Sequence, residues 1–350
     1  MPSNSKQFKE LVMKIVVDAF GGDNAPLEVV EGVLLAIKKH KDLEVILCGD
    51  EAKIKEVLAG RGERIEISHA PEVITNDDVP TSAIRHKKDS SMVRAFDILK
   101  EREDVIGMVS AGSTGAILTG AIMKIGRIKG LSRPALAPIL PTKKDNDVII
   151  IDSGANVDCK PVNLLHFALM GSAYYSIVYN KQQPRVALLS NGTEDHKGNE
   201  LTKEVFPLLK AAPINFIGNR EGFDFMSGEV DVMVADGFAA NALLKGTEGA
   251  VNAVLSILKH SIKAHFSSKI GYIFMKPTFR DIKKRVDVQK KHGGSPLLGC
   301  KKLVVKNHGN CKRLNILNSI EQTMLLHDKK LISRIEEALK AVGISEEKGE

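Results

Sequence analysis

The chain has 350 residues, of which 43% are hydrophobic and 27% charged, and its mean hydropathy is -0.07. These values are typical of a folded globular protein and exclude disordered, collagen-like and disulfide-framework chains. The net charge is +7, but residues 259–291 alone carry ten basic and two acidic residues, and the rest of the chain is close to neutral. This basic segment either attracts an acidic partner or is a solvated helix face.

The N-terminal residues 1–12 lack the apolar core of a signal peptide, so we expect a frayed extension and no export. The longest uncharged apolar stretch, 164–179, is shorter than the roughly 18 residues that a membrane-spanning helix needs. The cysteines stand far apart and predict reduced thiols. The HExxH, Walker and strand-linked GxGxxG motifs are absent, which removes the usual support for zinc-protease, P-loop and dinucleotide-binding functions.

Short apolar runs rich in β-branched residues alternate with helical patterns along most of the chain. The predicted strands are 14–18, 44–48, 64–68, 105–110, 148–152, 185–190, 214–218, 230–235 and 303–306. The predicted helices are 27–38, 52–58, 91–100, 115–124, 161–179, 199–210, 241–266 and 315–327. The strands are apolar on both faces, as in a sheet that helices cover on each side.

This alternation predicts an α/β fold, with a doubly wound, mostly parallel sheet and helices on both faces. We expect one continuous body over 13–335, with 250–292 as a protruding basic helical hairpin. Residues 336–350 are expected to hold the end of a C-terminal helix and a tail.

Five polar, glycine-rich loops directly follow predicted strands: 18–26, 110–115, 152–158, 191–199 and 236–241. Ligands of such folds bind outside the carboxyl ends of the strands, so these loops together predict an active site. One such loop alone would be an ordinary turn.

Two of these loops have features of an anion site. Gly112 to Gly115 lead into an apolar helix whose free N–H groups face the strand end, although a Ser or Thr here also serves as an ordinary N-cap. Lys197 stands beside the start of another helix and suits a phosphate or a developing oxyanion, or is a solvated lysine. His196 is a possible general acid, since an imidazole titrates near neutrality. The loop aspartates can hold a cation, act as bases or cap helices.

Taken together, the loop sequences resemble the bacterial phosphate acyltransferases of phospholipid synthesis, which move a fatty acyl chain from acyl carrier protein to inorganic phosphate. The matching stretches are 17–26 (VDAFGGDNAP), 84–93 (IRHKKDSSMV), 110–116 (SAGSTGA), 126–142 (GRIKGLSRPALAPILPT), 154–161 (GANVDCKP), 192–204 (GTEDHKGNELTKE), 214–219 (INFIGN) and 236–241 (DGFAAN). The resemblance runs in order from about residue 13 to about residue 327.

The resemblance implies a homodimer, no organic cofactor, no metal, no nucleic-acid partner, and a cytoplasmic protein peripherally associated with the inner face of the membrane. Lys197 would supply the catalytic charge and His196 a proton. Ser113, Thr114 and Asn241 would bind phosphate. The other implied substrate-binding residues are Asp18, Gly21, Gly22, Asp23, Gly115, Asn156, Asp158, Lys160, Gly192, Thr193, Asn199 and Asp236.

The sequence departs from the family pattern at Phe20, Asn24, Ser113, Cys159 and the pair Ala239-Ala240, where the family carries Thr-Gly. The last departure removes a hydroxyl beside the implied phosphate site. This change leaves open that the protein is a catalytically impaired, membrane-associated partner of other lipid enzymes. A second alternative is a short-chain phosphotransacylase that uses coenzyme A, because such an enzyme needs the same kind of site.

The basic segment holds an apolar run at 270–275 between two lysines. We expect it to form the tip of the hairpin, where apolar side chains enter the headgroup region and basic ones meet anionic lipid or the acidic acyl carrier protein. The expected contact residues are Lys269, Ile273, Phe274, Lys276, Arg280, Lys283 and Lys284.

Overall fold

The computed structural model describes residues 13–286 and 293–343. Within them the chain folds as two compact units, one formed by the stretches up to Ile125 and Lys302–His327, the other by Gly126–Lys301 and the residues from Asp328 on. The α/β class is confirmed. The sequence predicted one continuous body with one sheet, whereas the structure distinguishes two units, each with its own parallel strands.

Unit 1 is built on five parallel strands in the order β3-β2-β1-β4-β12. The strands are β1 (Met13–Asp18), β2 (Leu43–Gly49), β3 (Ile65–His69), β4 (Val105–Ser110) and β12 (Leu303–Lys306). Its helices are α1 (Leu27–Lys39), α2 (Glu51–Leu58), α3 (Pro80–His86), α4 (Ser91–Glu101), α5 (Thr114–Gly120), the π-helix η1 (Ala121–Ile125) and α11 (Arg313–Asp328), the last residue of which already belongs to unit 2.

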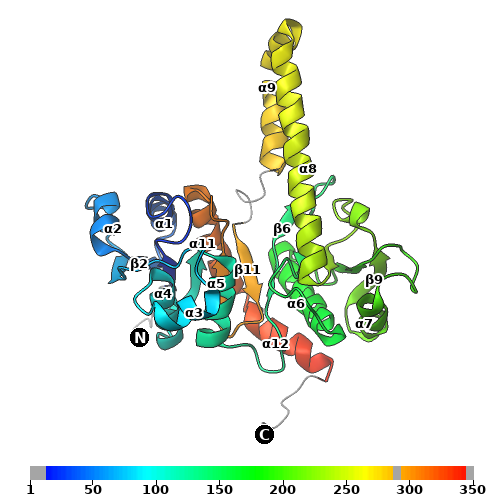
Figure 1. Ribbon diagram of the computed structural model, residues 1–350, viewed down its shortest axis with the longest axis horizontal. Helices are drawn as coiled ribbons and strands as arrows, with labels where there is room; N and C mark the ends of the chain where they lie inside the picture. The colour runs from blue at the N-terminus through cyan, green and yellow to red at the C-terminus, as the bar shows by residue number, and fades with distance from the viewer. Residues whose placement is uncertain (1–12, 287–292, 344–350) are drawn as a thin grey trace, which may run out of the picture. The chain divides into compact units, whose positions relative to one another are not determined.

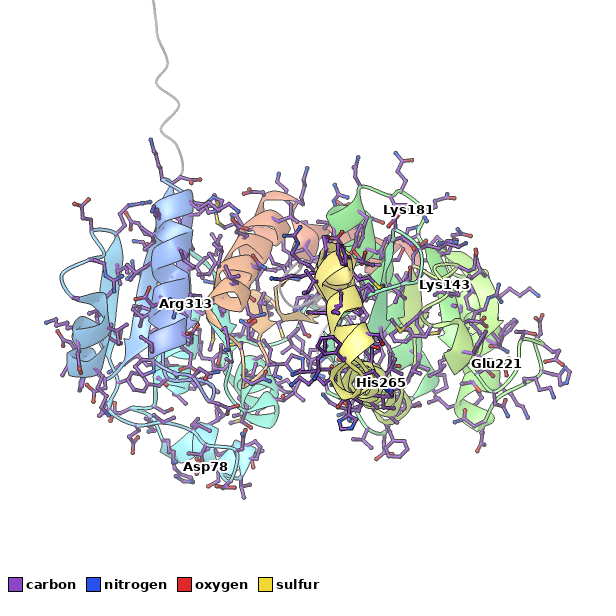
Figure 2. All side chains as sticks on the ribbon, turned by 90° about the horizontal axis from the view of Figure 1, so that it is seen from above. Asp78, Lys143, Lys181, Glu221, His265 and Arg313 are labelled. Atoms are coloured by element: carbon purple, nitrogen blue, oxygen red, sulfur yellow. The ribbon has the colours of Figure 1, made fainter. Side chains whose placement is uncertain are left out.

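Helices cover both faces of this sheet. Ile15 and Val17 of β1 point into a core that also holds residues of α1 and α11. The intervening Val16 is equally buried and points to the other face, which α4 covers. Arg313, at the start of α11, joins it to α1 by two side-chain hydrogen bonds to Glu28, of 2.7 and 3.0 Å (Figure 2). This alternation explains why the strands read as apolar on both faces.

Unit 2 contains the strand order β6-β7-β10-β8-β9, parallel except for the edge strand β6, and an antiparallel pair, β11 with β5. The strands are β5 (Ala135–Leu136), β6 (Ile139–Pro141), β7 (Asp147–Ile151), β8 (Arg185–Leu189), β9 (Asn215–Arg220), β10 (Val232–Val234) and β11 (Ser295–Leu298). The helices are α6 (Pro161–Tyr179), α7 (Glu200–Ala211), the 3-10 turn η2 (Gly222–Asp224), α8 (Gly237–Ala264), α9 (Phe266–Val286) and α12 (Leu331–Ala341).

Two helices pack on opposite faces of the unit 2 sheet. Helix α6 approaches the sheet so closely that a Cβ added at Gly171 would lie 2.7 Å from Val232 Cγ1 of β10. Glycine is therefore required at position 171. On the other face, Ala240 and Leu244 of α8 join a core with Ile150 and Met233. Beyond these first turns α8 is largely exposed, and α9 lies beside it, as Figure 1 shows in yellow and orange.

The expected helical hairpin is therefore present, but its turn lies elsewhere. Helices α8 and α9 meet at His265, and residues 270–275 are part of α9. Gly271 does not break this helix, and a Cβ added to it would meet no described atom within 4 Å. No described helix is long and apolar enough to cross a membrane.

Candidate functional site

In unit 1 the loops after β1 and β4 are tied together by a buried carboxylate. Asp18 is 1% exposed and accepts a hydrogen bond of 2.7 Å from Ser110 Oγ and one of 3.3 Å from the Phe20 N–H. Ser110 Oγ in turn accepts from the Gly112 N–H at 3.1 Å. Burial raises the pKa of Asp18, and its hydrogen bonds oppose that rise. Asp18 thus links the loop after β1 to the loop after β4 through Ser110.

Glycine is needed where these two loops touch. A Cβ on Gly21 would lie 2.6 Å from Asp18 Oδ2 and 2.7 Å from the Gly112 nitrogen. Gly22 has φ +97° and would meet Gly309 O at 2.8 Å. Both glycines predicted as binding residues therefore have a backbone role: Gly21 lets the loop after β4 approach closely, and Gly22 does the same for the loop after β12.

A third loop of this edge, residues 307–311 after β12, was not predicted from the sequence. The Asp23 N–H donates to Gly309 O at 2.7 Å, Asn24 Nδ2 donates to Cys311 O at 3.1 Å, and the Asn307 N–H donates to Ser110 O at 2.8 Å. The sequence does indicate this loop, because the polar, glycine-containing stretch Asn-His-Gly-Asn directly follows a predicted strand, as the other five loops do.

The start of α5 was predicted as an anion site or an ordinary N-cap. Ser113 stands at the N-cap position, yet in the described part of the chain its side chain makes no cap hydrogen bond. Ser113, Thr114 and Gly115 are partly exposed. Gly115 also packs against Pro80, where a Cβ would lie 2.8 Å from the ring.

In unit 2, three of the predicted loops follow β7, β10 and β8, which are neighbouring parallel strands, so the loops lie at one edge of the sheet. The first is organised by Asp152, which is fully buried. It accepts from the N–H groups of Leu136 (2.9 Å), Ala155 (3.2 Å) and Asn156 (2.6 Å), and from Asn156 Nδ2 (2.9 Å). Burial raises the pKa of Asp152, and these hydrogen bonds oppose that rise.

The loops after β7 and β10 are joined through Asn156. Its carbonyl oxygen accepts a 2.8 Å hydrogen bond from the Gly237 N–H, and a Cβ on Gly237 would lie 2.4 Å from that oxygen. Asn156 is 3% exposed, and its amide also donates to Pro134 O at 2.8 Å. Asp236 caps α8 by accepting from the N–H groups of Phe238 and Ala239. Of these two predicted binding residues, Asn156 joins the loops and Asp236 caps the helix.

Other predicted residues of these loops are open to solvent. Asp158, Lys160 and Asn241 are exposed. Asn241 lies over Gly154, since a Cβ on that glycine would be 3.4 Å from Asn241 Cγ and 3.6 Å from its Oδ1. Asn241 is therefore positioned by both loops and still able to meet a ligand.

The loop after β8 presents Lys197. Its N–H donates to Glu194 O at 3.0 Å, and its side-chain stem lies over Gly192, where a Cβ would be 2.9 Å from Lys197 Cγ. Lys197 is partly exposed, whereas Thr193 and His196 are exposed. Asn199 accepts from the Thr202 N–H at 2.9 Å and caps α7. Lys197 is thus the lysine of this loop, and its side-chain stem packs over Gly192.

The side chains of the expected contact surface on α9 are exposed, as far as they are described. Ile273 is 67% and Phe274 81% exposed, and Lys269, Lys276 and Arg280 are exposed as well. The side chains of Lys283 and Lys284 lie outside the described residues. On α8, the apolar side chains of Val254 and Leu258 are also exposed, so this chain alone does not bury them.

Comparisons with known proteins identify the family of this chain. The family model described as "Fatty acid synthesis protein" matches residues 13–334. Proteins named phosphate acyltransferase from Clostridium tetani and Thermoanaerobacterium thermosaccharolyticum are 45% and 44% identical, over 93% and 95% of this chain and 98% of each relative. A solved phosphotransacetylase from Streptococcus pyogenes has a similar fold, with a TM-score of 0.55 and 18% identity over 95% of this chain and 96% of its own. The chain belongs to the phosphate acyltransferase family and is an acyltransferase.

Proposed function

We propose that the protein transfers a long-chain fatty acyl group from acyl carrier protein to inorganic phosphate, which gives an acyl phosphate for phospholipid synthesis. The observation that carries the proposal is the meeting of three loops at one edge of the unit 2 sheet, with Lys197 and Asn241 accessible there, in a chain of this family. The long acyl chain, the carrier protein and the pathway belong to the proposal.

The reaction needs no covalent enzyme intermediate, because a thioester carbonyl is already activated. A phosphate oxygen attacks the carbonyl carbon and forms a tetrahedral oxyanion. The C–S bond then breaks, the carbonyl re-forms, and the carrier leaves as a thiolate that takes up a proton. The enzyme must hold a phosphate oxygen over the face of the carbonyl carbon and stabilise the oxyanion.

The accessible residues can be given these roles. Lys197 supplies positive charge to the phosphate and the oxyanion, and the exposed His196 protonates the thiolate. In the same unit, Asn241 is a phosphate donor. The phosphate contact expected of Ser113 and Thr114, in unit 1, is a separate part of the proposal. Asp152 and Asp18 act through the loops that they organise.

Purified protein tests the proposal directly. Acyl phosphate formation is measured from palmitoyl-acyl carrier protein and from acetyl-coenzyme A, each with and without phosphate. We expect phosphate-dependent turnover of the long-chain carrier thioester. Faster turnover of acetyl-coenzyme A would establish the short-chain alternative, and no turnover of either substrate would favour the catalytically impaired one.

We also propose that the α8–α9 hairpin serves a homodimer and an anionic membrane surface. In support of the dimer, α8 exposes the apolar side chain of Ile257, at 66%. In support of the membrane contact, α9 exposes Ile273 and Phe274, at 67% and 81%. Lysines on the same segment complement anionic lipid and the acidic carrier protein.

A further inference from the structure

An exposed aromatic side chain borders the unit 2 site. Phe238 is 69% exposed although it lies in the first turn of α8, between the buried residues Gly237 and Ala240. Its N–H donates to Asp236 Oδ1 at 3.0 Å, so its backbone is fixed by the helix cap. Because Ala240 and Leu244 supply the packing of this helix on the sheet, the phenyl ring has no part in the core.

A second apolar side chain lies at the same junction. Val157, 60% exposed, directly follows Asn156, whose carbonyl oxygen accepts the Gly237 N–H at 2.8 Å. Phe238 directly follows Gly237. The two apolar residues therefore flank one hydrogen bond between the loops.

This apolar pair stands beside a polar group. Asn241 follows Phe238 by three residues, which places both on one side of α8, and Asn241 lies against Gly154. One short surface of unit 2 thus offers an amide and a phenyl ring next to each other. A molecule with a polar reacting end and a hydrocarbon chain would use both.

We propose that Phe238 and Val157 contact the hydrocarbon chain of the acyl substrate and set a preference for longer chains. Each methylene that leaves water on such a surface strengthens binding, so the contribution grows with chain length. Two side chains are too small an area for protein docking, which takes about 800 Å² from each partner. The inference rests on the proposed acyl transfer for its substrate and goes beyond it in naming the residues that select chain length.

The test compares wild type with Phe238→Ala and Phe238→Leu on carrier thioesters of 4, 8 and 12 carbons. For Phe238→Ala we expect kcat/KM to fall about tenfold at 12 carbons and progressively less at 8 and 4, chiefly through KM. Phe238→Leu should recover most of the loss, because it restores an apolar contact. Phe223→Ala is the matched control, since Phe223 is 90% exposed in the same unit but lies on η2.

Binding of unreactive alkyl thioethers of the carrier, with 4 and 12 carbons, separates this inference from the proposed function. If the wild type turns over no thioester but binds the 12-carbon ether more tightly, and Phe238→Ala removes that difference, the chain contact holds and the proposed reaction fails. An equal loss at every chain length, or an unchanged length dependence in Phe238→Ala, would overturn the contact.

Discussion

At the scale of single residues, the same side-chain types serve two purposes in this protein. Asp236 and Asn199 cap helices, and Asp152 and Asn156 close a loop, although the sequence offers all four as candidate ligand-binding groups. Their neighbours Asn241 and Lys197 stay accessible. The loops could be predicted from the sequence, because polar residues after apolar runs are visible there. Which of these polar residues stays accessible to a ligand depends on hydrogen bonds between the loops. The sequence does not show those hydrogen bonds.

Lys197→Ala should lower turnover about tenfold or more, because the charge acts where negative charge develops. Steady-state kinetics with the carrier thioester and phosphate measure the effect. Lys203→Ala, which removes an exposed lysine of α7, is the control and should keep activity. Turnover near wild type in a well-folded Lys197→Ala protein would remove this lysine from the mechanism.

Ala239→Thr should lower the KM for phosphate, because it restores the hydroxyl that the family carries beside Asp236. The single change is preferable to the double one with Ala240→Gly, since Ala240 is fully buried and loss of its methyl would cost about 1 kcal/mol of stability. Initial rates at varied phosphate concentration test this. Ala242→Thr, at an exposed position three residues further on, is the control. A phosphate KM equal to that of wild type would place position 239 outside the phosphate site.

His166 should make the stability of unit 2 depend on pH. It is 2% exposed in α6, its Nδ1 lies 3.4 Å from Ser132 Oγ, and its buried Nε2 has no hydrogen-bond partner among the described residues. Burial lowers its pKa below the usual 6.5. Below pH 6.5 the unfolded chain takes up a proton that the native protein does not, so stability falls as the pH falls.

The size of this effect is up to about 1 kcal/mol per pH unit below 6.5. Urea unfolding of wild type and His166→Gln at pH 7.5 and 5.5 measures it, and the variant should lose less stability between the two pH values. Equal losses would show that His166 does not titrate on unfolding.

At the scale of elements, the sequence predicted the strands and helices that are long apolar runs and missed the short ones. All nine predicted strands are present, but β5, β6 and β11 were missed, because they have two to four residues and lie near prolines. Helix α3 has seven residues and was missed for the same reason. The helix predicted at 115–124 is α5 followed by a π-helix. Short elements depend on tertiary pairing more than on periodicity.

The hairpin should bind anionic vesicles through α9. We expect the double variant Ile273→Asp/Phe274→Asp to lose sedimentation with phosphatidylglycerol vesicles, because both side chains are exposed and a charge in the headgroup boundary is unfavourable. Binding of the wild type should weaken as salt rises.

A matched pair on α8, Val254→Asp/Ile257→Asp, serves as the control and should keep vesicle binding. The mass of each variant in solution reports on the dimer. If the α9 variant still sediments with vesicles, or falls apart as a dimer, this part of α9 belongs to a protein interface.

At the scale of the whole molecule, the division into two units could not be predicted from the strands. Runs such as 105–110 and 148–152 are alike in length and composition, yet the first lies between β1 and β12 and the second between β6 and β10. Pairing is decided by contacts between residues far apart in the chain. The five loops, expected on one edge, accordingly belong to the carboxyl edges of two sets of parallel strands.

The interrupted path of unit 1 has a consequence for synthesis of the protein. Strand β4 pairs with β12, and residues 126–301 separate the two stretches that make up the unit. At the usual pace of translation, roughly 10 to 40 s pass between the emergence of the two strands. Throughout that interval one side of β4 lacks its partner, and an open strand edge invites pairing with another nascent chain. A chain whose synthesis ends before residue 303 therefore lacks β12, and the sheet of unit 1 stays incomplete.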